Sequence, residues 1–401
     1  MASLNCNRRI SEQEDHDFIE PDWSGLQPEL VELILSKLSI INLIRCQAVC
    51  YAWCSAVKTI SSSGFSPWLL VRDDDAAASF CFFIAEENYF LKIKKHESVG
   101  KHDWCIGSSN GWLVLLDERW DPYLVNPFSQ VRIQLPSFTW LHPYVVKYLK
   151  PANNSLFKKV ILLSNPSQDK NNYAVAVTYW NMHRRKLCFC KNGDRDWTDI
   201  DGNLEDYSDI VCHNDMLYAI AKDCSIEAWD CRGPRPIKRL SMKPLLESRQ
   251  QSGMEKFIDS RYYKIKDNYY LVESSGKLLI VVRKTYYLLD PKNRVEAQQL
   301  NLPNRMLYFD VYELDFKEES WVLVESIGDR VLFLGKSHSM SMSAAAKSYP
   351  GCEEGDSIHF TSEYRMNGHC EVGVFSLGRR TVRPYTLKVR RPPLWITPNT
   401  R

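Results

Sequence analysis

The sequence predicts a multidomain chain, in which a small all-α module of three helices is followed by a large all-β domain. Apolar residues recur at helical spacing from residue 23 to about residue 60, and this period disappears from Trp68 onward. Short apolar or alternating runs bounded by Gly, Asn, Asp and Pro replace it, which is typical of antiparallel strands and tight turns. We expect the large domain to be a β-propeller of about six or seven blades.

Three short helices are expected in the first module. Pro28 suits a first helical turn because it has no N–H to leave unpaired, and the apolar residues behind it cover an arc of roughly 200°. Asn42 is expected to cap a second helix over 43–49, and a third helix continues with apolar spacing from Val49 to Ile60. An ordinary surface helix buries a stripe of only about 100°. We therefore expect this module to share an apolar face with another chain.

The large domain repeats one pattern, in which a turn dipeptide precedes an apolar run, a second turn and a second run. The pattern begins at Asn110-Gly111, Asn214-Asp215, Ser275-Gly276, Gly328-Asp329 and Gly355-Asp356, and the gaps suggest a further unit at 158–166. Repeated four-stranded units of about 40–50 residues are typical of β-propellers, whose blades cover one another's faces. Because the repeats are degenerate, a pair of β-sandwiches is the alternative architecture.

Composition and charge restrict the classes of function. The 401 residues carry a net charge of +2, which gives no general attraction to nucleic acid or to an anionic membrane. No run approaches the roughly 18 apolar residues of a transmembrane span. Residues 1–21 lack the apolar core of a signal peptide, and we interpret them as a disordered acidic tail. The 13 cysteines are an odd count with no recurring framework, and nothing directs the chain to an oxidising compartment, so they are expected to be reduced. Neither a metal nor a cofactor is expected.

The helical module resembles an F-box in the order and spacing of its residues. The matching residues are Leu26, Pro28, Glu29, Leu30, Leu33, Ile34, Leu35, Leu38, Leu43, Ile44, Arg45, Cys46, Val49, Cys50 and Trp53. The resemblance implies that residues 22–62 bind a Skp-type adaptor, and through it the cullin and RING subunits of a ubiquitin ligase. The family usually has proline directly after the first leucine, and Gln27 stands there in this chain. This departure would weaken adaptor binding.

We expect the adaptor to contact the outward arc of the first F-box helices. The candidate adaptor-binding residues are Pro28, Leu30, Leu33, Ile34, Leu38, Leu43 and Ile44. The sequence does not separate those that face the adaptor from those that form the module's own core. Trp53 is assigned to packing rather than to direct contact.

A second resemblance lies near the C-terminus. The runs 309–316 and 327–335, with Trp321 between them and 338–341 after them, resemble the C-terminal domain of plant F-box proteins of the SKIP/KIB type. The resemblance implies a plant protein with a propeller-like substrate-recognition domain. We expect this domain over 68–390, followed by a C-terminal tail over 391–401.

These interpretations together predict the substrate-recognition subunit of an SCF-type ubiquitin ligase in the nucleus, the cytoplasm or both. The F-box would dock the adaptor, and the propeller would hold an unidentified protein for ubiquitination and proteasomal degradation. Two alternatives remain open. One is an adaptor-binding scaffold outside a ligase, and the other is a propeller that binds or hydrolyses a small molecule, with an incidental helical leader.

No motif supports the enzyme alternative. His338-Ser339 suggests a nucleophile with Asp310, Asp315 or Asp329 as its partner, but Ser339 does not lie in a G-x-S-x-G turn. We interpret it as a turn residue in a blade and expect a non-catalytic receptor. The aromatic stretch 138–144 fits a contact for the target protein and a structural plug equally well.

Overall fold

The computed structural model of the chain describes residues 23–398 with several gaps. The gaps are 39, 60–65, 73–77, 86, 139–155, 170, 172, 182–183, 201, 205, 247–262, 289–304, 345–354, 367–368, 386 and 388. The chain divides into two compact units, with the boundary between Ser61 and Ser62. The tail expected over 1–21 lies outside the described residues. No helix in the described part is long and apolar enough to cross a membrane.

The first unit contains one 3-10 helix and three α-helices. Their bounds are η1 Trp23–Gly25, α1 Pro28–Ser36, α2 Ile40–Cys46 and α3 Tyr51–Thr59. Pro28 occupies the start of α1, where its missing N–H costs no hydrogen bond. Helix α3 contacts both α1 and α2. The buried indole of Trp53 donates its N–H to the carbonyl oxygen of Trp23 at 2.9 Å, so this side chain packs within the unit.

Two details of the predicted helices are wrong. Helix α2 begins at Ile40, so Asn42 lies inside it instead of at its N-cap, and the Asn42 Oδ1 accepts a hydrogen bond from Arg45 Nη1 at 3.2 Å. Val49 lies before α3 and is exposed, so it does not take part in the apolar face of that helix. The apolar residues ahead of Asn42 already belong to the helix, and tertiary packing overrides the capping preference of asparagine.

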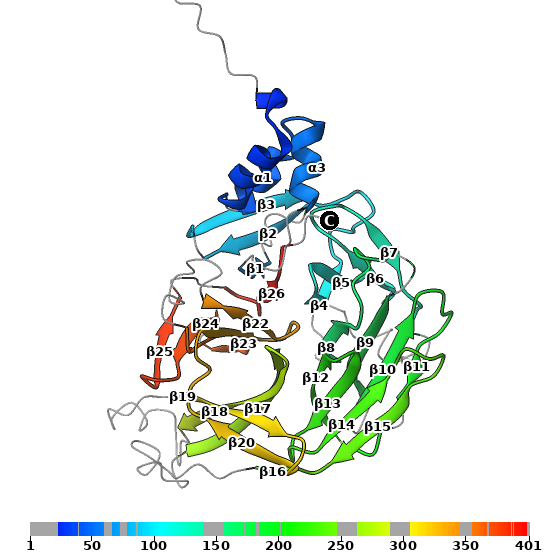
Figure 1. The fold of residues 1–401 in the computed structure, drawn as a ribbon. Coiled ribbons are helices and arrows are strands. Elements are labelled where there is room, and N and C mark those ends of the chain that lie inside the picture. The colour runs from blue at the N-terminus through cyan, green and yellow to red at the C-terminus, as the bar shows by residue number, and fades with distance from the viewer. Residues whose placement is uncertain are drawn as a thin grey trace, which may run out of the picture. The chain divides into compact units, whose positions relative to one another are not determined.

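The second unit is a β-propeller of six blades, each of which is one sheet. The strands of the first two blades are β1 Trp68–Val71, β2 Ser79–Ile84, β3 Tyr89–Lys94, β4 Trp104–Ser109, β5 Trp112–Leu116, β6 Pro122–Val125, β7 Arg132–Gln134 and β26 Leu394–Ile396. Blade 1 has the order β26-β1-β2-β3, and blade 2 has the order β4-β5-β6-β7. Figure 1 shows the six sheets following one another in a ring, from cyan through green to red.

Blades 3 and 4 are regular antiparallel sheets. Their strands are β8 Phe157–Leu162, β9 Ala174–Asn181, β10 Arg184–Lys191, β11 Thr198–Asp199, β12 Tyr207–His213, β13 Met216–Ala221, β14 Ile226–Asp230 and β15 Ile237–Met242. Blade 3 has the order β8-β9-β10-β11, and blade 4 has the order β12-β13-β14-β15. Most of β8 falls in the unit predicted at 158–166.

Blades 5 and 6 each contain a fifth strand. Their strands are β16 Leu245–Leu246, β17 Tyr263–Ser274, β18 Lys277–Leu288, β19 Arg305–Asp315, β20 Ser320–Val324, β21 Arg330–Leu334, β22 Met340–Ser343, β23 Ser357–Met366, β24 His369–Ser376 and β25 Thr381–Pro384. Blade 5 has the order β17-β18-β19-β20-β16, and blade 6 has the order β22-β21-β23-β24-β25. Strand β16 is parallel to β20, and β21 is parallel to β23. In every blade the strand named first is nearest the axis, since β26, β4, β8, β12, β17 and β22 contact one another in turn.

The predicted turn dipeptides lie where strands begin. Asn110-Gly111, Asn214-Asp215 and Ser275-Gly276 are two-residue loops between the first two strands of blades 2, 4 and 5. Both residues of each loop have positive φ, which is the conformation of the type I′ hairpin turn that glycine and asparagine favour. Gly328-Asp329 and Gly355-Asp356 precede β21 and β23, which belong to the same blade. That shared blade explains the uneven spacing of the last repeats.

Apolar clusters fill the space between neighbouring blades. Trp321 of blade 5, for example, lies in one cluster with Ile220 and Ile226 of blade 4. Phe333 of blade 6 lies in another cluster with Leu69 of blade 1. Because neighbours cover both faces of a blade, a strand such as β5 is buried at every position instead of alternating. This radial packing excludes the β-sandwich alternative.

The C-terminal strand closes the ring. Strand β26 pairs antiparallel with β1, so blade 1 combines strands from both ends of the unit. Trp395 in β26 is 1 % exposed, and its indole N–H donates to the carbonyl oxygen of Leu334 at 3.1 Å. The tail predicted over 391–401 is therefore wrong, because 394–396 form a buried strand. The run 394–396 has only three apolar residues and lies between prolines, so the sequence did not predict a strand there.

Replacing Trp395 with alanine should destabilise the propeller by about 3–5 kcal/mol, because the change leaves a cavity at the ring closure. Urea denaturation followed by fluorescence would measure this loss. Trp180→Ala is the matched control, since Trp180 is exposed at the end of β9 and its loss should cost about 1 kcal/mol or less. Equal losses for the two variants would show that β26 does not hold the ring together.

Candidate adaptor-docking face and propeller centre

Helix α1 has two apolar faces, of which one is buried. Val31 and Leu35 are buried one helical turn apart. Leu30 and Leu33 are 47 % and 58 % exposed, and Ile34 is half-buried. At about 100° per residue, these three side chains cover an adjoining arc of about 100°. We call Leu30, Leu33 and Ile34 the docking face. Exposed apolar residues gathered on one face are typical of an interaction site.

The remaining face of α1 is polar. Glu29, Glu32 and Ser36 are exposed and occupy the arc of the helix between the docking face and the buried face, next to Leu33. Glu29 also lies in the first helical turn, where a negative charge is favourable to the helix dipole. The helix therefore presents separate apolar and polar surfaces, which is the arrangement of a helix that packs on both its own module and a partner.

The structure divides the remaining candidate residues by exposure. Pro28 is exposed, and Leu38 and Ile44 are half-buried. Leu43 is only 1 % exposed, so its side chain supports packing and we exclude it from the docking face. Direct contact between the adaptor and the other candidates stays a prediction.

Gln27 keeps the backbone path that proline would have given. It has φ −61° and ψ 141°, an extended conformation with the φ that a proline ring fixes. The following Pro28 favours this same region for the residue before it. The carbonyl oxygen of Gln27 accepts hydrogen bonds from the N–H groups of Leu30 and Val31. The departure from the F-box pattern therefore changes a side chain and leaves the start of α1 unchanged.

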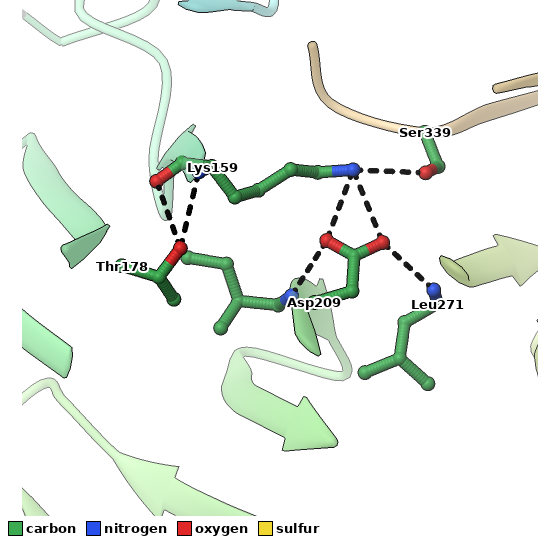
Figure 2. Close-up of polar contacts among 6 residues, drawn as sticks. Lys159, Thr178, Asp209, Leu271 and Ser339 are labelled. Carbon is green, nitrogen blue, oxygen red and sulfur yellow. Dashed lines mark hydrogen bonds and ion pairs between the residues drawn. The ribbon is translucent and has the colours of Figure 1, made fainter. Parts of the chain in front are cut away.

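A polar cluster joins the innermost strands of the propeller (Figure 2). The ammonium group of Lys159 on β8 lies 3.0 Å from Asp209 Oδ1 on β12, and it donates to Ser339 Oγ at 3.1 Å. The other carboxylate oxygen of Asp209 accepts the N–H of Leu271 on β17 at 2.9 Å. Ser339 directly precedes β22. One buried ion pair thus connects blades 3, 4, 5 and 6.

The segment before β22 also reaches the first two blades. We call residues 335–339 the central crossing. Ser337 Oγ accepts the N–H of Trp395 in β26 at 3.1 Å, and the N–H of His338 donates to the carbonyl oxygen of Ser108 in β4 at 3.1 Å. Together with the Lys159–Ser339 hydrogen bond, these contacts attach the central crossing to blades 1, 2 and 3. It therefore ties together strands that are far apart in the sequence.

Burial changes the titration of two groups at the centre. Loss of solvent raises the pKa of Asp209, although the charge of Lys159 and the hydrogen bonds that Asp209 accepts oppose this rise. Burial lowers the pKa of His338 to about 4, and the nearby charge of Lys159 acts in the same direction. His338 is therefore neutral near pH 7.

The centre does not assemble the nucleophile considered from the sequence. Ser339 accepts a hydrogen bond from Lys159, whose ammonium group is already paired with Asp209. Asp310 pairs with Lys284 and Arg380 instead, and Asp329 accepts the hydroxyl of Ser343. Asp315 accepts the backbone N–H groups of its own turn. The described contacts therefore suit a structural connection between blades.

One sequence pattern could have revealed this cluster. Lys159 interrupts the apolar run of β8, and Asp209 interrupts that of β12, at positions that are buried in the structure. Buried charges are rare unless they are paired. The sequence shows each interruption, but it does not show that the two strands are neighbours. Of the aromatic stretch 138–144, Phe138 is buried against Phe157 and Trp197, and the rest lies outside the described residues.

Known protein families match both units. An F-box domain matches residues 23–62. The KIB1-4 beta-propeller family matches residues 80–376, which is most of the second unit. The chain is thus an F-box protein with a propeller, and it belongs to the KIB1-4 beta-propeller family. This confirms the resemblance to plant F-box proteins of the KIB type.

Similar proteins cover nearly the whole chain. "Putative F-box protein At4g17565" of Arabidopsis thaliana is 25 % identical over 377 residues, which cover 90 % of this chain and 87 % of that protein. "F-box/kelch-repeat protein KIB1" of the same plant is 25 % identical over 375 residues, covering 90 % and 84 %. Among solved structures, TolB from Acinetobacter baumannii has a TM-score of 0.40 at 11 % identity, covering 86 % of this chain and 70 % of that one.

Lys159→Met should destabilise the propeller by about 3–5 kcal/mol, because it leaves the buried carboxylate of Asp209 without its counter-charge. Lys277→Met is the matched control. Lys277 pairs with Glu313 at an exposed site, where losing the ion pair should cost less than about 1 kcal/mol. Urea denaturation of both variants would measure the difference. A loss no larger than that of the control would contradict a stabilising role for the central cluster.

The propeller should become less stable as the pH falls, because the pKa of His338 is lowered in the folded state. A lowered pKa means that the unfolded chain binds a proton that the native chain does not, so stability is lost as pH falls from about 6.5 to about 4. Between pH 7 and pH 5 the wild-type chain should lose roughly 1–2 kcal/mol more than His338→Gln. Denaturation at several pH values gives both slopes. Identical slopes would show that His338 is not neutralised by burial.

Proposed function

We propose that this chain is the substrate-recognition subunit of an SCF-type ubiquitin ligase in the nucleus or cytoplasm. Its F-box would bind a Skp-type adaptor, and through it the cullin and RING subunits. Its propeller would hold a target protein for ubiquitination and proteasomal degradation. The match to an F-box domain and the family membership support this proposal. The observation that carries it is the exposed docking face of α1.

Binding of a partner over the docking face would be favourable, because it would remove exposed apolar side chains from water. Leu30 and Leu33 leave about half of their side chains in water. Covering a large apolar side chain fully contributes about 1.5–3 kcal/mol, so an adaptor groove that covered both would gain substantial affinity. A few such anchors usually dominate an interface, and truncating one costs about 2 kcal/mol or more. The polar face of α1 can remain in solvent when the adaptor is bound.

The propeller is suited to hold a protein target without chemistry of its own. Its strands pack against those of neighbouring blades. The loops that connect them lie on the rims, and loops are where recognition residues are usually found. At its centre, Lys159 and Asp209 are satisfied by each other, by Ser339 and by the N–H of Leu271. We therefore favour a non-catalytic receptor over a hydrolase. Adaptor binding without any chain-dependent ubiquitination of captured proteins would favour the scaffold alternative instead.

Leu30→Asp combined with Leu33→Asp should remove adaptor binding, because two charges would enter an apolar interface. The full chain would be co-expressed with a Skp-type adaptor, and the complex would be quantified after affinity purification. Ser36→Asp is the control, since it adds a charge on the polar face of the same helix. We expect the control to retain the complex and the double variant to bind about 1000-fold more weakly, at about 2 kcal/mol for each leucine.

Circular dichroism would show that the double variant still folds, as the exposure of both leucines leads us to expect. If the folded double variant kept the adaptor, the docking face would be wrong. If the wild-type chain did not bind the adaptor, the ligase proposal itself would fail.

A further inference from the structure

A pocket of about 340 Å³ opens between blades 1 and 2. Its walls come from the end of β1, the start of β2, and the starts of β4 and β26. The innermost strands of both blades begin here, so the pocket lies on one rim of the propeller. Its volume is within the range of small-ligand sites and would accommodate a few side chains of a peptide.

The pocket is strongly basic in a chain that is nearly neutral overall. Four cationic side chains, Arg72, Lys95, Lys101 and Arg391, line it, whereas Asp103 is the one carboxylate among its described lining residues. Within the described part of the chain, no ion pair is formed by Lys95 or Lys101. The whole protein has a net charge of only +2. This local excess therefore does not reflect a generally basic surface, and it favours an anionic ligand.

The carboxylate of Asp103 is engaged by hydrogen-bond donors of the protein itself. Asp103 Oδ2 accepts the N–H of Gly100 at 2.8 Å and the hydroxyl of Tyr123. A side chain at Gly100 would meet Asp103 Oδ1 at 2.4 Å, so it would displace this carboxylate. Asp103 is thus engaged by neutral donors and does not pair with the lysines of the pocket.

Aromatic rings orient the cations. Trp104 has the guanidinium carbon of Arg72 at 4.6 Å from its ring centroid and that of Arg391 at 5.4 Å. The ammonium nitrogen of Lys95 lies 5.4 Å from the ring centroid of Phe80. A guanidinium group offers several N–H donors in one plane, which suits carboxylate or phosphate oxygens. The indole N–H of Trp104 is buried and has no hydrogen-bond partner among the described residues.

Burial is the main cause of the lowered pKa of Lys95. The charge of Asp103 opposes this shift, and the charge of Arg72 adds a smaller lowering effect. A bound anion would relieve both unfavourable effects. The charge and the geometry of the pocket therefore both favour a negatively charged ligand.

We propose that this pocket binds an acidic segment of the protein that the propeller recruits. The anionic side chain, a carboxylate or a phosphate, lies among Lys95, Lys101 and the two arginines. An apolar neighbour in the segment lies against the apolar wall that includes Leu394. This inference rests on the proposed function, because it assumes that the propeller recruits a protein. A phosphate carries about −1.5 to −2 charges, so it should bind more tightly than a carboxylate.

The chain itself carries an acidic run close in sequence to the pocket. Asp73, Asp74 and Asp75 directly follow Arg72 and lie outside the described residues. Their carboxylates are a second source of negative charge. The experiment must therefore separate an external acidic segment from this internal one.

Labelled nine-residue peptide pools with a central phosphoserine, glutamate or serine between degenerate flanks would be titrated with the full chain. Fluorescence polarisation would measure their affinities. The test variant is Lys95→Gln with Lys101→Glu. The matched control is Lys277→Gln with Lys317→Glu, which makes the same chemical changes on blade 5. A third variant replaces Asp73, Asp74 and Asp75 with asparagine, and anionic vesicles of phosphatidylcholine and phosphatidylserine serve as a different probe.

We expect the phosphoserine pool to bind most tightly, the glutamate pool next and the serine pool at least about tenfold more weakly than the phosphoserine pool. The test variant should lose about tenfold or more in affinity for the acidic pools, while the control keeps it. Equal affinity for the serine pool, or equal loss in test and control variants, would overturn the proposal. So would binding to vesicles alone, which would indicate a lipid surface.

Peptide binding that appears only after the three aspartates are replaced would show that the chain's own acidic segment fills the pocket, and would also overturn the proposal. Adaptor co-purification separates this test from the proposed function. The test variant does not alter the docking face and should keep the adaptor, so loss of peptide binding alone concerns the pocket. Loss of adaptor binding by the wild-type chain would instead concern the proposed function.

Discussion

Ring closure is the constraint on which the second unit depends. Each blade has apolar residues on both faces, so it is stable only between two neighbours. A ring of such blades must join its last blade to its first. Strand β26 does this by pairing with β1, and Trp395 then connects β26 to the end of β21 and to the central crossing. The two ends of the unit therefore have to meet before any blade is complete.

The central cluster places charge where the blades converge. Lys159 and Asp209 are buried, and burying two charges costs more than a simple ion pair returns unless hydrogen bonds satisfy the remaining groups. Here Ser339 and the N–H of Leu271 supply those bonds. Each partner comes from a different blade, so the pair is satisfied only in the closed ring. The cluster thus favours one arrangement of the blades over others.

Local patterns in the sequence predicted the types of secondary structure better than they predicted which elements contact one another. Residue pairs such as Asn110-Gly111 were placed in turns because few residues adopt positive φ, and that preference is local. The three helices and the blade architecture followed from periodicity. The start of α2 and the strand 394–396 were missed, because they depend on contacts with distant parts of the chain. A short apolar run has no local property that distinguishes a closing strand from a tail.

Of the candidate sites, too, the sequence predicted the features that depend on local periodicity and missed those that depend on tertiary packing. Periodicity predicted that α1 has more apolar surface than its module can bury, and the structure adds which residues remain exposed. Leu43 could not be assigned from the sequence, because its burial depends on how the helices pack. The basic pocket could not be predicted at all, since its cations come from segments near residues 72, 95, 101 and 391. The pairing of β26 with β1 brings the segment near residue 391 to the other three.

The proposed function depends on one claim: the two units have separate tasks, and α1 carries the adaptor contact. Hydrogen–deuterium exchange of the full chain, with and without a Skp-type adaptor, tests this claim most directly. We expect the adaptor to protect peptides from 28–46 and to leave the innermost strands of the propeller unchanged. Protection on the propeller with no change in 28–46 would contradict the claim.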